Sequence, residues 1–361
     1  MAPSAFGRRA GAVGSPPQHY GNLVAEQRAL AAGEAIVDLS DRDVLSVTGE
    51  DRLTWLDSLT SQRLTGLAPG ESTETLLLDP SGRIEYAARV LDDGETTWLL
   101  LDTGTGVGLF AFLDRMRFML RVEVADRSAE FATIGSLGDS LPAGVPAAEP
   151  HGIPLTWSDP WTAVASGGHQ YATTPTHPAA DWHYRETLVE RSRLGELDAL
   201  PAAGTLALEA LRIAAWRPRA ATEVDATSIP HEFDWLRSAV HLTKGCYRGQ
   251  ETVAKVHNLG HPPRRLVMLH LDGSDGVLPA AGDVVSSGDV AVGRVTASAL
   301  HHELGPIALA VVKRGVDPAA TLTVATADGT TVAAAQEVIV PPDAGAEADI
   351  PKLPRLGAVT R

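Results

Sequence analysis

The chain has 361 residues, one cysteine and a formal net charge of −15 at pH 7. Its length exceeds what one hydrophobic core usually holds and predicts two or three domains, and its hydrophobic fraction of 44% is that of an ordinary globular protein. A single cysteine excludes an intrachain disulfide, and the acidic charge argues against broad nucleic-acid binding while leaving room for a local basic site that takes a small anion.

Neither a membrane span nor a secretion signal is predicted. No apolar run approaches the roughly 20 residues that a transmembrane helix requires. The pair Arg8–Arg9 precedes a segment too short and broken for a signal core. We therefore expect a cytoplasmic protein. Residues 1–20 and 341–361 are rich in Pro, Ala, Gly and charge and are predicted to be flexible tails.

The first half of the chain alternates between helical and strand patterns. A helix is expected at 22–32, and another opens at 49–51 and carries Leu53, Leu56 and Leu59 at helical spacing. A third helix is expected at 106–117. Short strands separated by turn residues are predicted at 35–39, 44–48, 75–79, 83–91, 96–101, 121–126 and 131–134. This mixture indicates an α+β region, which we place at 21–262 as two lobes.

The second half is irregular at first and then becomes regular. Residues 137–183 show little pattern, and their histidines lack the spacing of metal ligands. Helices are expected at 184–194 and 205–215. Beyond a boundary near 260–263, six evenly spaced strands are predicted at 266–271, 283–286, 290–296, 307–312, 321–325 and 331–334. Such spacing is typical of a small barrel or sandwich, here 263–340.

The only cysteine lies in the richest motif of the chain, residues 243–251. Cys246 stands between two glycines, with Lys244 and Arg248 each two residues away. Nearby cations favour a thiolate, and a helix beginning at Gln250 would place Glu251 in its first turn. A functional thiol is therefore one of two interpretations that the motif leaves open. A small buried hydrophobic residue is the alternative, since that is the commonest role of a lone cysteine.

This motif carries a family resemblance. Residues 244–251, Lys-Gly-Cys-Tyr-Arg-Gly-Gln-Glu, resemble the K-G-C-[FY]-x-G-Q-E signature of the YgfZ-type folate-binding proteins, a branch of the glycine cleavage T-protein (aminomethyltransferase) superfamily. Supporting similarity occurs at 35–40, 44–49, 209–215, 222–225 and 256–265. The resemblance covers roughly residues 30–335, and the cysteine octet is its most specific part.

The resemblance implies three lobes around a central funnel, with an antiparallel β-barrel as the last lobe and a tetrahydrofolate in the funnel. It also implies a role in iron–sulfur cluster assembly or repair, with iron–sulfur enzymes or assembly proteins as partners. Cys246 and Lys244 would be the working residues. The remaining motif positions would be Gly245, Tyr247, Arg248, Gly249, Gln250 and Glu251. One thiolate cannot hold a cluster alone, so its contact with a cluster would be transient.

The chain departs from the aminomethyltransferases in two stretches of sequence. Tyr86 and Ala87 stand where those enzymes carry paired acids, with Glu85 one residue away, and Ala214 stands where they have a glutamate. Losing these carboxylates argues against classical aminomethyl transfer. One-carbon transfer using Glu85, Glu223 or Asp225 remains an alternative. A third alternative is a binding or scaffold protein in which Cys246 has only a structural role.

Folate contacts are expected from arginines, because the glutamate tail of folate is anionic. Arginine pairs well with carboxylates, and Arg42, Arg212, Arg248, Arg264 and Arg265 are available. We assign Arg42, Tyr86, Arg212 and Arg264 as candidate folate contacts. No metal site is predicted.

Overall fold

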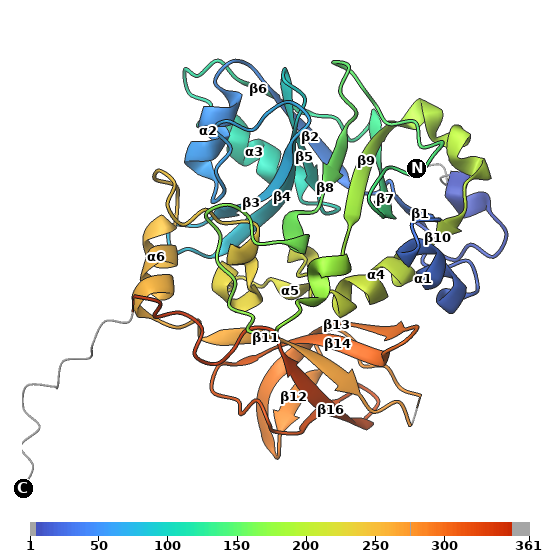
Figure 1. Ribbon diagram of the computed structural model, residues 1–361, viewed down its shortest axis with the longest axis vertical. Helices are drawn as coiled ribbons and strands as arrows, with labels where there is room; N and C mark the ends of the chain where they lie inside the picture. Colours follow the sequence, from blue (N-terminus) through green and yellow to red (C-terminus); the bar gives the residue numbers. More distant parts are fainter. Residues whose placement is uncertain (1–4, 275, 349–361) are drawn as a thin grey trace, which may run out of the picture.

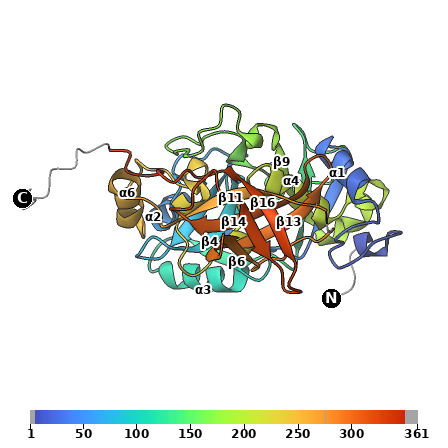
Figure 2. The same cartoon turned by 90° about the horizontal axis from the view of Figure 1, so that it is seen from below.

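The computed structural model describes residues 5–274 and 276–348. Within these ranges the strands form two five-stranded sheets and one closed barrel. Figure 1 shows the barrel, orange to red, beneath the two sheets, and Figure 2 views the molecule from the barrel side. The α+β class, the three lobes and the C-terminal antiparallel barrel expected from the sequence are confirmed.

The first lobe is a sheet with the strand order β3-β4-β5-β2-β6. Its strands are β2 (Asp43–Thr48), β3 (Ser72–Leu78), β4 (Ile84–Asp92), β5 (Thr96–Leu101) and β6 (Glu123–Asp126). Helices α2 (Arg52–Leu59) and α3 (Gly106–Met116) cover one face. There Trp55, Leu99 and Leu109 share a buried core. The opposite face of the sheet is left for contact with the second lobe.

The second lobe is a sheet with the order β10-β1-β7-β9-β8. Its strands are β1 (Ile36–Leu39), β7 (Phe131–Leu137), β8 (Thr156–Ser158), β9 (Tyr184–Glu190) and β10 (Ala202–Ala203). Helix α1 (Leu23–Ala31) packs against α4 (Thr205–Ala214), and the short α5 (Ala220–Glu223) follows. Because α4 also contacts barrel strand β13, this helix joins the second lobe to the barrel.

The third lobe is a closed antiparallel barrel with the order β11-β14-β13-β12-β15-β16. Its strands are β11 (Arg264–Leu271), β12 (Val284–Ser287), β13 (Val290–His301), β14 (Gly305–Lys313), β15 (Leu322–Ala325) and β16 (Thr331–Val338). Alternate residues such as Val267 and Leu269 point inward and are completely buried. In β15 and β16 buried residues alternate with more exposed ones, which is the period of two of half-buried strands, whereas β11 and β14 are buried on both faces.

The helix expected at 184–194 is wrong. Residues Tyr184–Glu190 form β9, and a 3-10 helix (Arg191–Ala199) follows. Strand β9 lies between β7 and β8, and residues on both of its faces, Thr187 and Leu188 among them, are buried. A strand covered on both faces does not alternate between apolar and polar residues, so its sequence lacks the period that would have identified it.

The N-terminal tail prediction is also wrong for residues 5–20. A 3-10 helix (Ala5–Arg8) places Phe6 in a completely buried position beside Leu197. Arg9 then donates hydrogen bonds of 2.7 Å to the backbone carbonyls of Leu197 and Leu200. One aromatic anchor and one arginine therefore hold the segment against the second lobe. Residues 1–4 of the predicted tail lie outside the described residues.

The first part of the predicted C-terminal tail pairs with helix α6 (Gln250–Leu259). The backbone N–H of Glu347 donates to the carbonyl of His257 at 2.9 Å, and that of Ala348 to Asn258 at 3.2 Å. These bonds satisfy carbonyls that the last turn of a helix leaves unpaired. Residues 349–361 lie outside the described residues. In the described ranges, no helix combines the length and apolar character needed to cross a membrane.

Candidate functional site

A polar cavity lies between the two sheets, and all of its lining residues precede the barrel. Its volume of about 60 Å³ has room for roughly five water molecules. Among the described residues, nine of the nineteen that line it are charged. The arginines are Arg42, Arg89, Arg212, Arg217 and Arg219, and the acids are Glu74, Asp102, Asp159 and Glu209. Trp182, Tyr184 and Trp235 supply aromatic walls.

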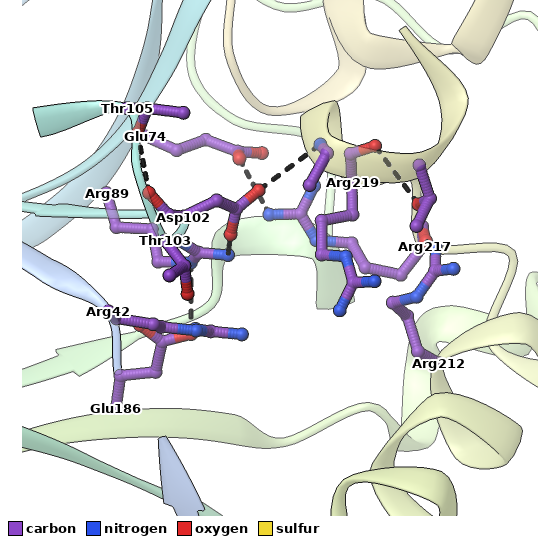
Figure 3. A network of polar contacts seen from close by, with 12 residues as sticks. Arg42, Glu74, Arg89, Asp102, Thr103, Thr105, Glu186, Arg212, Arg217 and Arg219 are labelled. Carbon is purple, nitrogen blue, oxygen red and sulfur yellow. Dashed lines mark hydrogen bonds and ion pairs between the residues drawn. The ribbon is translucent and has the colours of Figure 1, made fainter. Parts of the chain in front are cut away.

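One group of charges joins the facing strands of the two lobes (Figure 3). Arg89 on β4 lies 3.0 Å from Glu186 on β9 and 3.1 Å from Asp102, which follows β5. Arg42 also pairs with Glu186. Burial alone would raise the pKa of Asp102, but Arg89, Arg42 and Arg219 outweigh it and hold that pKa well below its usual value. The carboxylate of Asp102 is therefore ionised at neutral pH.

A second group lies on α4 and the segment after it. Arg212 Nε donates to Glu209 at 3.0 Å, and Arg212 Nη1 lies 3.0 Å from Glu223. Burial would raise the pKa of Glu209, but Arg212 and Arg219 lower it to about 2. Arg219 makes a looser pair with Glu209, at 3.5 Å, and its Nε has no partner among the described residues. Arg219 thus has the weakest ion pairing of the arginines that line the cavity.

The third group centres on Arg217, which holds two buried carboxylates. Its Nη2 lies 2.6 Å from Glu74, and its Nε lies 2.9 Å from Asp159. Asp159 also accepts a bond of 2.9 Å from the indole N–H of Trp182. Burial raises the pKa of Asp159, and the charge of Glu74 adds to the rise, against the opposing effect of Arg217.

A second, more open pocket of about 330 Å³ borders the cavity. The two share Leu39, Arg42, Asp102, Thr205 and Arg219 as lining residues. The outer wall of the second pocket includes Ser15, Pro16 and Gln18, from the segment predicted as a tail. The inner cavity and the outer pocket are therefore adjacent, with Arg42 and Arg219 lining both at their junction.

Cys246 lies elsewhere, on the loop between the segment at His241 and helix α6. The thiol is exposed and does not line the cavity. The loop is fixed by close backbone contact. Gly249 adopts φ +83°, and a Cβ there would lie 2.6 Å from the carbonyl oxygen of Asp79 and 3.0 Å from Gly82. Only glycine fits so close to the β3–β4 turn. The thiol is thus displayed on a well-defined loop.

Lys244 is a structural residue in this arrangement. Its Nζ donates to the backbone carbonyls of Asp57, Thr60 and Gln62 and lies 3.3 Å from the Asp57 carboxylate. Burial lowers the pKa of Lys244, while Asp57 opposes that fall. The ammonium group is buried, whereas Cys246 is exposed, so Lys244 anchors the loop to the end of α2.

The other motif residues also hold the loop in place. Arg248 lies 2.7 Å from Glu85 on β4 and stacks over the ring of Phe112 on α3. Tyr247 is buried, and burial raises the pKa of its hydroxyl. The side chain of Gln250 donates to the carbonyl of Lys244 at 3.3 Å. Gly245 and Glu251 are exposed, and Glu251 lies in the first turn of α6.

The four candidate folate contacts divide into two pairs. Arg42 and Arg212 line the cavity. Tyr86 does not, because it packs under α2 and α3 on the face of β4 opposite to Ala87 and Arg89. Arg264 does not either, because it pairs with Asp225 at 2.6 Å and with Glu232.

The carboxylates expected in the funnel are not the ones found there. Glu85 lies at the surface with Arg248, Asp225 pairs with Arg264, and Glu223 is buried behind Arg212. Sequence analysis missed the four acids that do line the cavity. Two signals were available, namely an acid inside the apolar strand 72–78 and the three arginines at 212–219. In the described ranges, no group of three or more His, Cys, Asp or Glu residues is placed to hold a metal ion.

Comparison with known proteins identifies the fold. Residues 264–342 match the family model of the glycine cleavage T-protein C-terminal barrel domain. The whole chain superposes on the crystal structure of the glycine cleavage system aminomethyltransferase T from Bartonella henselae with a TM-score of 0.71 and 17% identity, covering 93% of this chain and 96% of that one. The chain therefore has the T-protein fold.

Two sequence relatives are transferases by name. An aminomethyltransferase of Herpetosiphon aurantiacus is 26% identical over 311 residues, which is 83% of this chain and 84% of that protein. A putative chloroplastic transferase of Arabidopsis thaliana is 25% identical over 260 residues, which is 66% of this chain. The match spans only 56% of the length of that relative. The chain is therefore aminomethyltransferase-like, and its own activity is a matter for proposal.

Proposed function

Starting from the T-protein fold, we propose that this chain is a tetrahydrofolate-binding accessory protein for iron–sulfur cluster assembly or repair. The folate binds in the cavity between the two sheets, and Cys246 acts on partner proteins from the surface. The resemblance of residues 244–251 to the YgfZ-type signature motivates the iron–sulfur part. The cytoplasmic location expected from the sequence remains a prediction, since one relative is chloroplastic.

The observation that carries the folate part is the arginine-lined cavity with aromatic walls. Trp182 and Tyr184 stack with ring centroids 5.1 Å apart and offer flat apolar surface to a heteroaromatic ring. Arg42 and Arg219 at the junction suit the anionic tail. The outer pocket offers space beyond them. The inner cavity alone is small, so a ring enters it by displacing water and opening the 3.5 Å contact between Arg219 and Glu209.

The accessible thiol supports the second part of the proposal. Cys246 is exposed on a loop held by Lys244, Arg248 and Gly249, so a macromolecular partner can reach it. A cluster usually takes four thiolates, and this chain has one cysteine. The proposed contact is therefore transient, with the partner supplying the remaining ligands. The partners are iron–sulfur enzymes or cluster-assembly proteins.

Folate binding is tested by calorimetric titration of the purified protein with tetrahydrofolate. Saturable binding is expected, and Arg219→Gln should weaken it about tenfold or more, because a charge-assisted hydrogen bond is lost. Arg121→Gln is the matched control, since Arg121 pairs with Glu50 and Asp51 on the exposed surface. Absence of saturable binding to the wild-type protein overturns the folate part.

The iron–sulfur role is tested in cells that lack the gene, by measuring the activity of iron–sulfur enzymes alongside enzymes without clusters. Complementation with the wild-type gene is expected to restore the cluster enzymes, and complementation with Cys246→Ser is not. Folate binding by purified Cys246→Ser should match the wild type. Full restoration by Cys246→Ser rejects a working thiol and favours a scaffold role for the motif.

Folate-dependent one-carbon transfer is the second candidate, and the acids of the cavity favour it. Asp159 has a raised pKa in the cavity, as a general acid–base group requires. The relatives named as transferases point in the same direction. Measurable formation of methylene-tetrahydrofolate from an aminomethyl-lipoyl carrier protein, abolished in Asp159→Asn, would establish this activity.

A further inference from the structure

Glu74 on β3 has a buried carboxylate oxygen without a partner. The side chain lines the cavity, and only 3% of the residue is exposed. Its Oε2 pairs with Arg217 at 2.6 Å, but its Oε1 has no hydrogen-bond partner among the described residues. Asp159 pairs with the same arginine and also accepts hydrogen bonds from the backbone N–H of Trp161 and the indole N–H of Trp182. Glu74 is thus the incompletely bonded member of the Arg217 group.

A buried carboxylate oxygen without a donor is energetically costly, and a ligand that supplies the donor removes the cost. The charges around Arg217 favour such a ligand, because one guanidinium faces two carboxylates, Glu74 and Asp159. The inner end of the cavity therefore prefers a neutral or cationic group rich in N–H donors. The junction with the outer pocket, at Arg42 and Arg219, has the opposite preference.

Glu186 is the other acid in this region with an unpartnered oxygen, and it makes a useful contrast. Its Oε2 is buried without a partner, but the residue does not line the cavity. Its Oε1 accepts from Arg42, Arg89 and the hydroxyl of Tyr184. Glu186 therefore serves to hold the two lobes together, whereas Glu74 lines the cavity.

We propose that Glu74 is the specificity-determining residue of the cavity. Its free oxygen accepts hydrogen bonds from the donor edge of a flat ring, such as the ring N–H and amino group of a 2-amino-4-oxopyrimidine. Trp182, Tyr184 and Trp235 surround that ring, and the anionic end of the ligand lies at Arg219. This inference rests on the proposed folate binding and adds the residue that selects the ring.

Titration of the wild-type protein, Glu74→Gln and the control Glu95→Gln tests the assignment. Glu95 is an exposed acid on the turn before β5. Two ligands are compared, tetrahydrofolate and p-aminobenzoylglutamate, which has the tail without the ring. Glu74→Gln is expected to weaken the binding of tetrahydrofolate ten- to a hundredfold, because a hydrogen bond to a charged group is lost. The affinity for the tail fragment should stay unchanged.

The outcomes separate the two proposals. If wild-type protein binds no tetrahydrofolate, the folate function fails. If the wild-type protein binds tetrahydrofolate, and Glu74→Gln lowers the affinity for both ligands equally or for neither, the role of Glu74 is rejected. The folate function then stands. Should Glu74→Gln fail to fold, the wild-type protein answers the question with a folate analogue that lacks the 2-amino group. At least tenfold weaker binding of that analogue is expected, and equal affinity rejects the assignment.

Discussion

The ammonium of Lys244 lies 3.3 Å from the carboxylate of Asp57, inside the first lobe, while Cys246 two residues later is exposed. The loop thus turns its cation inward and its thiol outward. Lys244 therefore positions the loop, and the working role predicted for it beside Cys246 stays a prediction.

Replacing Lys244 tests that role. Lys244→Ala leaves the carbonyls of Asp57, Thr60 and Gln62 without their donor, so we expect the free energy of unfolding to fall by about 2–4 kcal/mol. Urea denaturation measures this change. Lys255→Ala, at an exposed position of α6, is the control and should change stability by less than about 0.5 kcal/mol. Equal effects of the two substitutions would contradict the anchoring role.

The two glycines of the motif are expected to respond differently to alanine. A Cβ at Gly249 would lie 2.6 Å from the Asp79 carbonyl, and φ is +83°, so Gly249→Ala should cost about 2 kcal/mol or more. A Cβ at Gly245 meets nothing within 4 Å, so Gly245→Ala should stay within about 0.5 kcal/mol of wild type. Thermal unfolding of both variants measures the difference. Unchanged stability of Gly249→Ala would mean that the close contact between Gly249 and the β3–β4 turn is absent in solution.

The thiol of Cys246 should react in the folded protein, and tetrahydrofolate should not protect it. The side chain is exposed and lies outside the cavity, so a bound ligand does not cover it. We expect alkylation rates with and without saturating tetrahydrofolate to agree within about twofold, an energy difference below 0.5 kcal/mol. Protection by the folate would place thiol and ligand in one site and contradict the separation described above.

Asp234 is expected to make stability depend on pH. Burial raises its pKa to about 7, although the backbone N–H groups of Tyr171 and Ala172 donate to it and lower that pKa. The folded protein then keeps a proton that the unfolded chain releases near pH 4. The stabilisation is present below pH 4 and is lost as the pH rises to 7.

Asp234→Asn removes this titration, and asparagine also suits the left-handed backbone at φ +55°. Its stability relative to wild type should therefore rise by about 4 kcal/mol between pH 4 and pH 7.5. Urea denaturation at both pH values measures the change, with the exposed Asp289→Asn as control. A difference that does not vary with pH would show that Asp234 is ionised at both limits.

The barrel could be predicted from the sequence because each of its strands is a short apolar segment between turn residues. Short polar turns separate the strands, and in β16 buried residues alternate with exposed ones, as Val332 and Ala334 illustrate. Strand β9 was not predicted, because burial on both faces removes the alternation and because Arg185 and Glu186 interrupt the apolar run that marks β11 and β14. The segment at Phe6 was missed for another reason, since one aromatic anchor in a Gly- and Pro-rich stretch leaves no periodic signal.

The cavity depends on contacts between distant parts of the chain. Glu74 and Arg217 are 143 residues apart, and neither residue has a local pattern that points to the other. Arg42 and Arg212 were identified through their charge, whereas Tyr86 and Arg264 satisfied the same chemical expectation but face other partners. Residue type predicted the chemistry of the site, and only the fold determined which residues of that type belong to it.

The cysteine loop and the cavity share no lining residue, and this separation bears on how such proteins diversify. Substitutions at sites without common partners usually have additive effects, so selection can act on Cys246 and on Glu74 independently. We therefore expect a variant without the thiol to keep the cavity, and a variant with an altered cavity to keep the exposed thiol. The presence of the cysteine octet in a genome sequence is therefore no guide to whether its owner still binds the ligand, and each site must be read from its own residues.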